Sequence, residues 1–96
     1  MMFTACSNKG FQMTFPNGWT VSVQWGPGNY CENRSMSGGW NAPIKEDFWK
    51  SRTAEIAAWD KNGVWYDGYD NGDQVDGYQT TDDVLKFMNE IAAKDA

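Results

Sequence analysis

The sequence predicts a single α+β domain, residues 1–96, in which an antiparallel sheet of four to five strands carries one C-terminal helix across a face. Two stretches of alternating apolar residues are each interrupted by a glycine-containing turn, which is typical of β-hairpins. Residues 82–94 instead repeat apolar side chains at helical spacing. A chain of 96 residues can build one modest core. We therefore expect one domain.

The first expected hairpin pairs residues 11–15 with residues 19–25 around the turn Pro16-Asn17-Gly18. A two-residue loop would place an aromatic residue opposite a threonine and mix the two faces. A three-residue loop pairs Phe15 with Trp19 and keeps apolar residues opposite one another along both strands. Proline at the first turn position and glycine at the third suit a type I turn closed by a G1 bulge.

The second expected hairpin spans residues 53–66 and turns at Asp60-Lys61-Asn62-Gly63, again a three-residue loop with a G1 bulge. This register places Trp59 opposite Trp65, and such an aromatic pair stabilises a hairpin by roughly 0.2–1 kcal/mol relative to an alanine pair. The opposite face then carries Ile56, Ala58, Val64 and Tyr66.

The C-terminal third is expected to turn at Asn71-Gly72, to form a short strand near Val75, and to end in a helix over residues 82–94. Thr80 and Thr81 are candidate N-caps, and acids in the first turn favour the helix dipole. The expected buried face is Val84, Phe87, Met88 and Ile91, with Leu85 and Ala92 beside it. Residues 1–10 read as a short polar start, and residues 30–52 as an aperiodic connection.

Charge is unevenly distributed along the chain. The whole chain has 13 acids, 8 bases and a net charge of −5, while residues 60–96 hold nine of the acids and only three lysines. This acidity disfavours direct binding to nucleic acid or an anionic membrane, because either needs a basic surface. It leaves open a partner protein or nucleoprotein with a basic surface, or a role in which the acidic surface imitates nucleic acid. With no signal peptide and no apolar run of 18 residues, we expect a cytoplasmic location and no membrane span.

Catalytic and metal-binding motifs are not recognisable in this chain. It has no histidine, and its two cysteines, Cys6 and Cys31, lack the spacing of a zinc site. Whether the two cysteines form a disulfide is left open. Nucleophile motifs and phosphate-binding loops are missing as well. We expect a protein that is not an enzyme and has no cofactor.

Two groups of residues are candidate binding sites. The first is a ladder of aspartates, which departs from the EF-hand calcium pattern and serves either as solvated turn residues or as an acidic surface for a partner. The second is a group of aromatic residues in the connection, which either anchor a partner or cover the sheet face that the helix leaves open. The acidic residues are Asp67, Asp70, Asp73 and Asp76, extended by Asp82 and Asp83; the aromatic residues are Trp40, Phe48 and Trp49.

Three stretches resemble small uncharacterised proteins of tailed bacteriophages and prophages: FPNGWTVSVQWGPGNYC (15–31), TAEIAAWD (53–60) and VDGYQTTDDVL (75–85). The resemblance implies a host-takeover or anti-defence factor, such as an anti-CRISPR protein, that binds a host protein. An acidic half would suit the positively charged channels in which such effector complexes hold nucleic acid.

The sequence therefore favours a small acidic interaction protein that inhibits a host protein, a defence or CRISPR component among the candidates, by steric or nucleic-acid-mimicking occlusion. One alternative is a ligand-binding module for sugar or calcium, using exposed tryptophans and the aspartate-rich loop. Another is a minor virion or assembly protein. Binding to a basic partner would weaken as salt rises.

Overall fold

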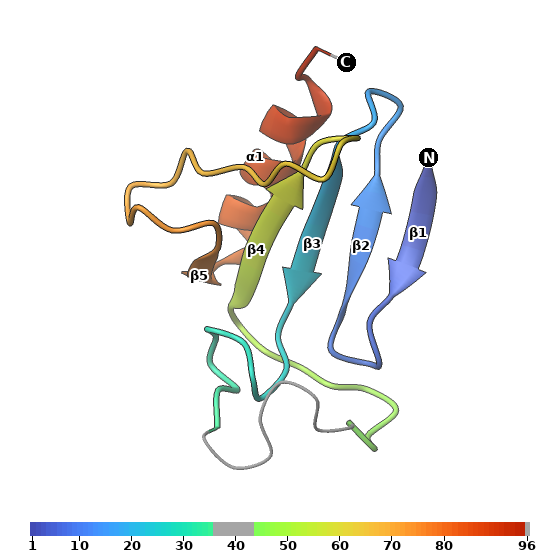
Figure 1. Ribbon diagram of the computed structural model, residues 1–96. Coiled ribbons are helices and arrows are strands. Elements are labelled where there is room, and N and C mark those ends of the chain that lie inside the picture. Colours follow the sequence, from blue (N-terminus) through green and yellow to red (C-terminus); the bar gives the residue numbers. More distant parts are fainter. Residues whose placement is uncertain (36–43, 96) are drawn as a thin grey trace.

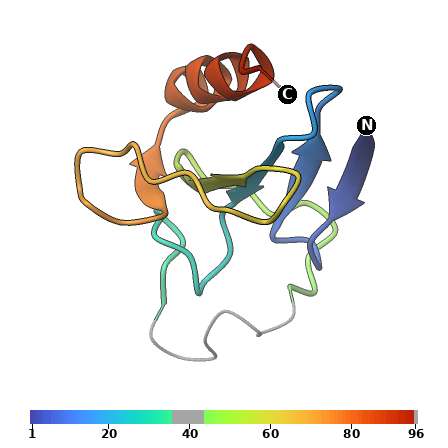
Figure 2. The same ribbon diagram turned by 45° about the horizontal axis from the view of Figure 1, so that its top comes forward.

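The computed structural model describes residues 1–35 and 44–95 as an antiparallel five-stranded sheet with one helix packed across it (Figure 1). The strands follow one another in chain order across the sheet, and each is antiparallel to its neighbour. Figure 2 shows the helix lying over one face. The predicted α+β fold is confirmed. Its elements are β1 (Met2–Ala5), β2 (Gly10–Thr14), β3 (Thr20–Gln24), β4 (Ala54–Trp59), β5 (Asp76–Gln79) and α1 (Thr81–Ala92).

The first hairpin, β2–β3, has the predicted register. Phe11 lies opposite Val23 and Met13 opposite Val21. The Phe15 N–H donates to the Trp19 carbonyl at 2.8 Å, and Gly18 takes a φ of +89°, as a G1 bulge requires. The turn chemistry therefore set the pairing of the two strands.

The second hairpin forms its predicted turn, but its return arm is shorter than expected. The Asp60 N–H donates to the Val64 carbonyl at 2.9 Å, and the rings of Trp59 and Trp65 meet at 5.1 Å between centroids. Beyond the single bridge between these tryptophans, the edge of β4 is taken by β5. Val64 was expected on the face of Ile56, but it lies past the end of β4 and is 62% exposed.

Strand β1 was not expected, because residues 1–10 read as a polar start. Met2–Ala5 pairs with β2, so that Phe3 lies opposite Met13. The connecting turn places Ser7 and Asn8 at φ values of +51° and +60°. Asparagine tolerates this left-handed conformation, but serine followed by asparagine is a weak hairpin signal compared with Asn-Gly. The local sequence therefore contains only a weak signal for this strand.

The core lies between the sheet and α1. Buried residues Val21, Val23, Ile56 and Ala58 face the helix, which contributes Phe87 and Ile91. Val84 and Met88 are partly buried against this cluster, whereas Leu85 is 60% exposed. The helical face that packs on the sheet is therefore as predicted, and Leu85 lies outside it.

Both ends of α1 are capped by side chains. Thr80 is the N-cap: its hydroxyl accepts from the Asp83 N–H, and the Asp83 carboxylate accepts from the Thr80 N–H, which forms a capping box. At the other end, the amide of Asn17 in the β2–β3 turn donates to the carbonyls of Ile91 (2.9 Å), Ala92 (3.3 Å) and Lys94 (3.0 Å). The first hairpin thereby caps a helix more than seventy residues away in the chain.

Within the described ranges, no helix is long and apolar enough to cross a membrane.

Candidate partner-binding site

An acidic depression lies between α1 and the loop that precedes β5. Its lining includes Asp70, Asp76, Asp83 and Glu90, with Lys86 as the one basic residue, around a volume of about 320 Å³. We call this surface the acidic depression. Three of its four acids were predicted as site residues. Glu90 was not, although it lies two helical turns after Asp83 and so shares its side of α1.

Asp83 also has a structural role within the acidic depression. The Thr80 backbone N–H and hydroxyl, which bond to Asp83, lower the pKa of its carboxyl group, and the charge of Lys86 acts in the same direction. The carboxylate is therefore already used in the N-terminal cap of the helix. Of the four acids, Asp70, Asp83 and Glu90 are exposed, and Asp70 and Glu90, which take no part in the capping box, are the most available to a partner.

A second, smaller depression adjoins the first and combines acids with tyrosines. Asp73 and Asp76 line it together with Tyr30 and Tyr78, around a volume of about 260 Å³. The two tyrosines are 47% and 56% exposed, and the Tyr78 N–H donates to the Tyr30 carbonyl at 2.9 Å. The Arg34 guanidinium lies 4.1 Å from the centre of the Tyr30 ring, so this ring already binds a cation within the chain.

The Tyr69 hydroxyl, in the lining of the acidic depression, is buried and has no hydrogen-bond partner among the described residues. Its ring packs against Tyr66 at 5.0 Å and Phe87 at 5.8 Å between centroids. Burial raises the pKa of this hydroxyl above its usual range, and the charges of Tyr66 and Asp76 act in the same direction. Tyr69 therefore remains neutral at physiological pH and holds an unused hydrogen-bonding group.

The remaining predicted acids lie outside the acidic depression. Asp67 is exposed and lines neither of the two depressions. Asp82 lies on the outer side of α1, beside Leu85 and Lys86. The structure thus brings together Asp70, Asp76 and Asp83, places Asp73 next to them, and separates Asp67 and Asp82 from the group.

The predicted aromatic residues lie away from the acids. Phe48 is 86% exposed, Trp49 is partly buried, and Trp40 falls outside the described residues. Phe48 and Trp49 line a depression that also contains Phe11 and Trp25. In Figures 1 and 2 the green segment that carries them lies towards β1 and β2, while residues 67–76 extend past β4 on the other side.

Trp49 has a visible structural contact. Its indole N–H donates to the Trp25 carbonyl at 2.9 Å, and the Trp25 indole N–H donates to the Trp49 carbonyl at 2.7 Å. The two residues thereby tie the connection to the end of β3. This reciprocal pair gives Trp49 a structural role that requires no partner protein. Phe48, by contrast, has most of its ring in solvent.

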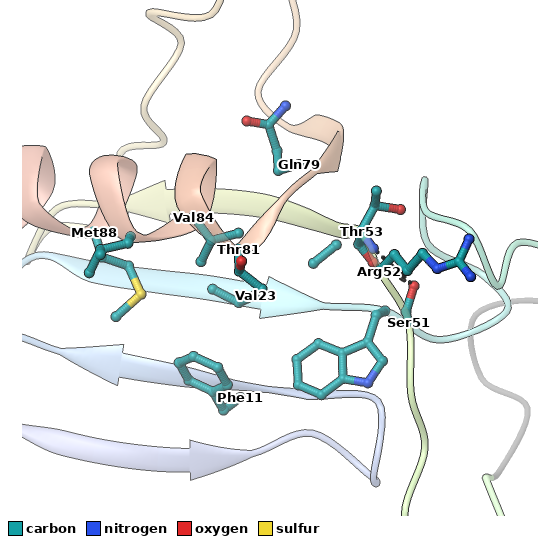
Figure 3. A pocket seen from close by; sticks show the side chains of 12 residues that line it. Phe11, Val23, Ser51, Arg52, Thr53, Gln79, Thr81, Val84 and Met88 are labelled. Atoms are coloured by element: carbon teal, nitrogen blue, oxygen red, sulfur yellow. Dashed lines mark hydrogen bonds between the residues drawn. The ribbon is translucent and has the colours of Figure 1, made fainter.

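An apolar groove runs along the other side of α1 (Figure 3). Val84 and Met88 point from the helix towards Val23 and Phe11 of the sheet, and Trp25, Ala54 and Leu85 complete the apolar lining. The volume is about 310 Å³. Arg52 is the one charged residue in this lining, and its guanidinium points away from the groove (Figure 3). Sequence reasoning missed this groove, because it depends on how far the helix covers β2 and β3.

The described part of the chain contains no group of three or more His, Cys, Asp or Glu residues arranged to hold a metal ion. Cys6 and Cys31 are both free thiols, which answers the question that their spacing left open. Burial raises the pKa of each thiol, so neither is an activated nucleophile.

Comparison with known proteins assigns no relative: no family model, no curated protein and no solved structure matches this chain. The resemblance to phage proteins therefore stays a prediction.

Proposed function

We propose that this protein is a binding module, and not an enzyme, which recognises a basic and partly apolar segment of another protein across helix α1. The observation that carries the proposal is the position of α1 between two different surfaces. Thr81, Val84 and Met88 line the apolar groove on one side of the helix, while Asp83 and Glu90 line the acidic depression on the other.

The outer side of α1 connects the two surfaces. Asp82, Leu85 and Lys86 lie along it, and Leu85 belongs to the apolar groove as well. A segment that crosses the helix can therefore place an apolar side chain in the groove and a lysine or arginine among the carboxylates. Buried apolar anchors supply most of the binding energy of such contacts, whereas charge complementarity mainly sets specificity and association rate.

The chemistry of the acidic depression suits a cation. Four carboxylates surround it against one lysine, and the buried Tyr69 hydroxyl has no hydrogen-bond partner among the described residues. A guanidinium presents several donors in a fixed arrangement and pairs well with carboxylates, so an arginine is the preferred guest. Tyr78, at the adjoining depression, provides a ring face for a further basic side chain, whereas the Tyr30 ring already binds Arg34.

In biological terms, we propose a phage-type inhibitor that acts in the cytoplasm of a bacterial host. Its acidic surface would occupy a basic surface on a host protein or nucleoprotein, a defence or CRISPR component among them, and exclude the nucleic acid that normally binds there. The acidic C-terminal part of the chain and the resemblance to phage proteins support this finer assignment.

Capture of partners from a bacterial lysate, read by mass spectrometry at low and high salt, tests the proposal. We expect one main basic protein or nucleoprotein that is lost at high salt. The variant D70K/E90K reverses two exposed acids of the acidic depression and should weaken capture by at least about tenfold. The control D67K/D95K changes the net charge equally at exposed acids elsewhere, and should stay within about twofold of the unmodified protein.

The apolar half of the site is tested separately. Leu85→Ser removes a leucine that is 60% exposed from the groove. The control Val64→Ser removes a valine that is 62% exposed from the second hairpin. We expect only the first to reduce capture. Equal losses for the two charge variants, or no captured protein at either salt, would contradict the proposed function.

A further inference from the structure

Strand β1 is an open edge of the sheet. It pairs with β2 on one side and has no strand on the other in the described chain. The Cys6 N–H donates to the Gly10 carbonyl at 3.0 Å, so Cys6 directs its backbone groups towards β2. Because these directions alternate along a strand, Met2 and Thr4 also face β2, whereas Phe3 and Ala5 present their N–H and carbonyl groups outwards.

This edge lacks the usual devices that prevent strands from pairing between molecules. Natural edges carry lysines, prolines or bulges, or are covered by other segments. Residues 2–6 contain no charged residue and no proline, and Met2 and Phe3 are 66% and 79% exposed. The other edge of the sheet is protected: Tyr78 of β5 has a φ of +53°, and its N–H is used by the Tyr30 carbonyl.

The distribution of charge favours a second copy of the same chain at this edge. The first acid in the sequence is Glu32, so no carboxylate belongs to β1, β2 or β3. The acidic depression lies at the β5 side of the sheet. Two copies joined through β1 would therefore keep their acidic depressions as far apart as the sheet allows, which limits repulsion between chains that each carry a net charge of −5.

The strand is also complementary to itself. With a twofold axis at Thr4, Phe3 of one copy lies opposite Ala5 of the other, and these are the two residues with outward backbone groups. The large phenylalanine then meets the small alanine on the helix-bearing face, and the two threonines meet on the other face, where a Thr–Thr pair is favourable. Phe3 would continue the apolar row of Met13 and Val21.

We infer that two copies of this chain associate through antiparallel pairing of their β1 edges, which forms one continuous sheet with both helices on the same face. Such a dimer places one acidic depression at each end of the shared sheet. It would present two binding sites to a partner, although the pairing does not depend on the proposed function.

Sedimentation equilibrium of the full chain tests this inference, from about 10 μM to about 1 mM, because a short edge buries less surface than a standard interface and should bind weakly. We expect the average mass to rise with concentration from 10.9 kDa towards twice that value. Association should strengthen with salt, which screens repulsion between the acidic chains. Binding of a basic partner should show the opposite dependence, so the two proposals can fail separately.

Two variants locate the interface. Ala5→Pro removes an outward N–H without removing a bond to β2, since proline is tolerated at sheet edges. Phe3→Lys adds a charge to the same edge. Each should weaken association by at least about tenfold, while Val64→Lys, at a 62% exposed valine in the second hairpin, should leave it unchanged. Circular dichroism checks that each variant is folded.

A constant mass of one chain over the whole concentration range would overturn the inference. So would a dimer that Ala5→Pro leaves intact while folded, or one that Val64→Lys dissociates as strongly as Phe3→Lys.

Discussion

Substitution of Asn17 by alanine should destabilise the protein far more than its position in a surface turn suggests. Its amide nitrogen caps three carbonyls at the end of α1, and its side-chain oxygen accepts from the Trp19 N–H at 3.0 Å. The substitution therefore acts on two elements together.

The expected magnitude follows from counting these bonds. The amide has two hydrogens for three carbonyls, so we count two donated bonds and one accepted bond, each with a net value of about 1 kcal/mol. The carbonyl of Ile91 is partly buried and loses its partner without full access to water, whereas those of Ala92 and Lys94 are exposed. We expect a loss of about 2–3 kcal/mol, which lowers the Tm by about 10–20 °C for a domain of this size.

Asn62 provides the matched control, since it occupies the same position in the second turn of the same type. Its side chain has no hydrogen-bond partner among residues 1–35 and 44–95. Asn62→Ala should therefore change the free energy of unfolding by no more than about 0.5 kcal/mol. Urea unfolding of both variants, followed by tryptophan fluorescence, gives the comparison.

Asn17→Asp sharpens the test. The aspartate keeps the acceptor for Trp19 but places a negative charge against the carbonyls at the negative end of the helix dipole. It should be less stable than Asn17→Ala at pH 7, and the difference should shrink as the carboxylate is protonated at low pH. If Asn17→Ala and Asn62→Ala differ by less than about 0.5 kcal/mol, the capping argument is wrong.

Four further predictions concern α1 and the connection. Thr80→Ala removes the N-cap hydroxyl and should cost about 1 kcal/mol in urea unfolding. The native pKa of Asp83 lies below its ordinary value of 3.8, so the stabilising effect of its carboxylate should be complete above pH 3.8 and disappear as pH falls through the native pKa. The free energy of unfolding of Asp83→Asn should therefore approach that of the unmodified protein as the pH is lowered in acid unfolding. Trp49→Phe deletes the indole bond to the Trp25 carbonyl and should cost about 1 kcal/mol, measured by chemical unfolding. Ile91→Ala, at a fully buried side chain, should cost about 2–5 kcal/mol and lower the Tm most among these four.

Predictions that rest on neighbouring residues agree closely with the structure. The register of β2–β3 follows from Pro16-Asn17-Gly18, because a three-residue turn and the alternation of apolar residues permit one pairing that keeps both faces consistent. The helix follows from its apolar spacing and from threonine at its start, and it begins at Thr81 rather than at residue 82.

The candidate site was predicted only in part. The aspartates were recognised as acidic, but their distances from one another depend on how the loop before β5 folds against α1. That packing brings Asp70 and Asp76 to Asp83 and Glu90, and leaves Asp67 outside. The apolar groove depends in the same way on the area of sheet that the helix leaves uncovered.

The sequence by itself determined the hairpin turns, the helix, the uneven distribution of charge and the α+β class, because each depends on residues close together in the chain. Tertiary structure decided the pairing of β5 with β4, the open edge at β1 and the second role of Asn17 as a helix cap. These features join residues far apart in sequence. Which segments pair there depends on which of several whole elements packs most favourably at one sheet edge or one helix end. No local pattern records that outcome.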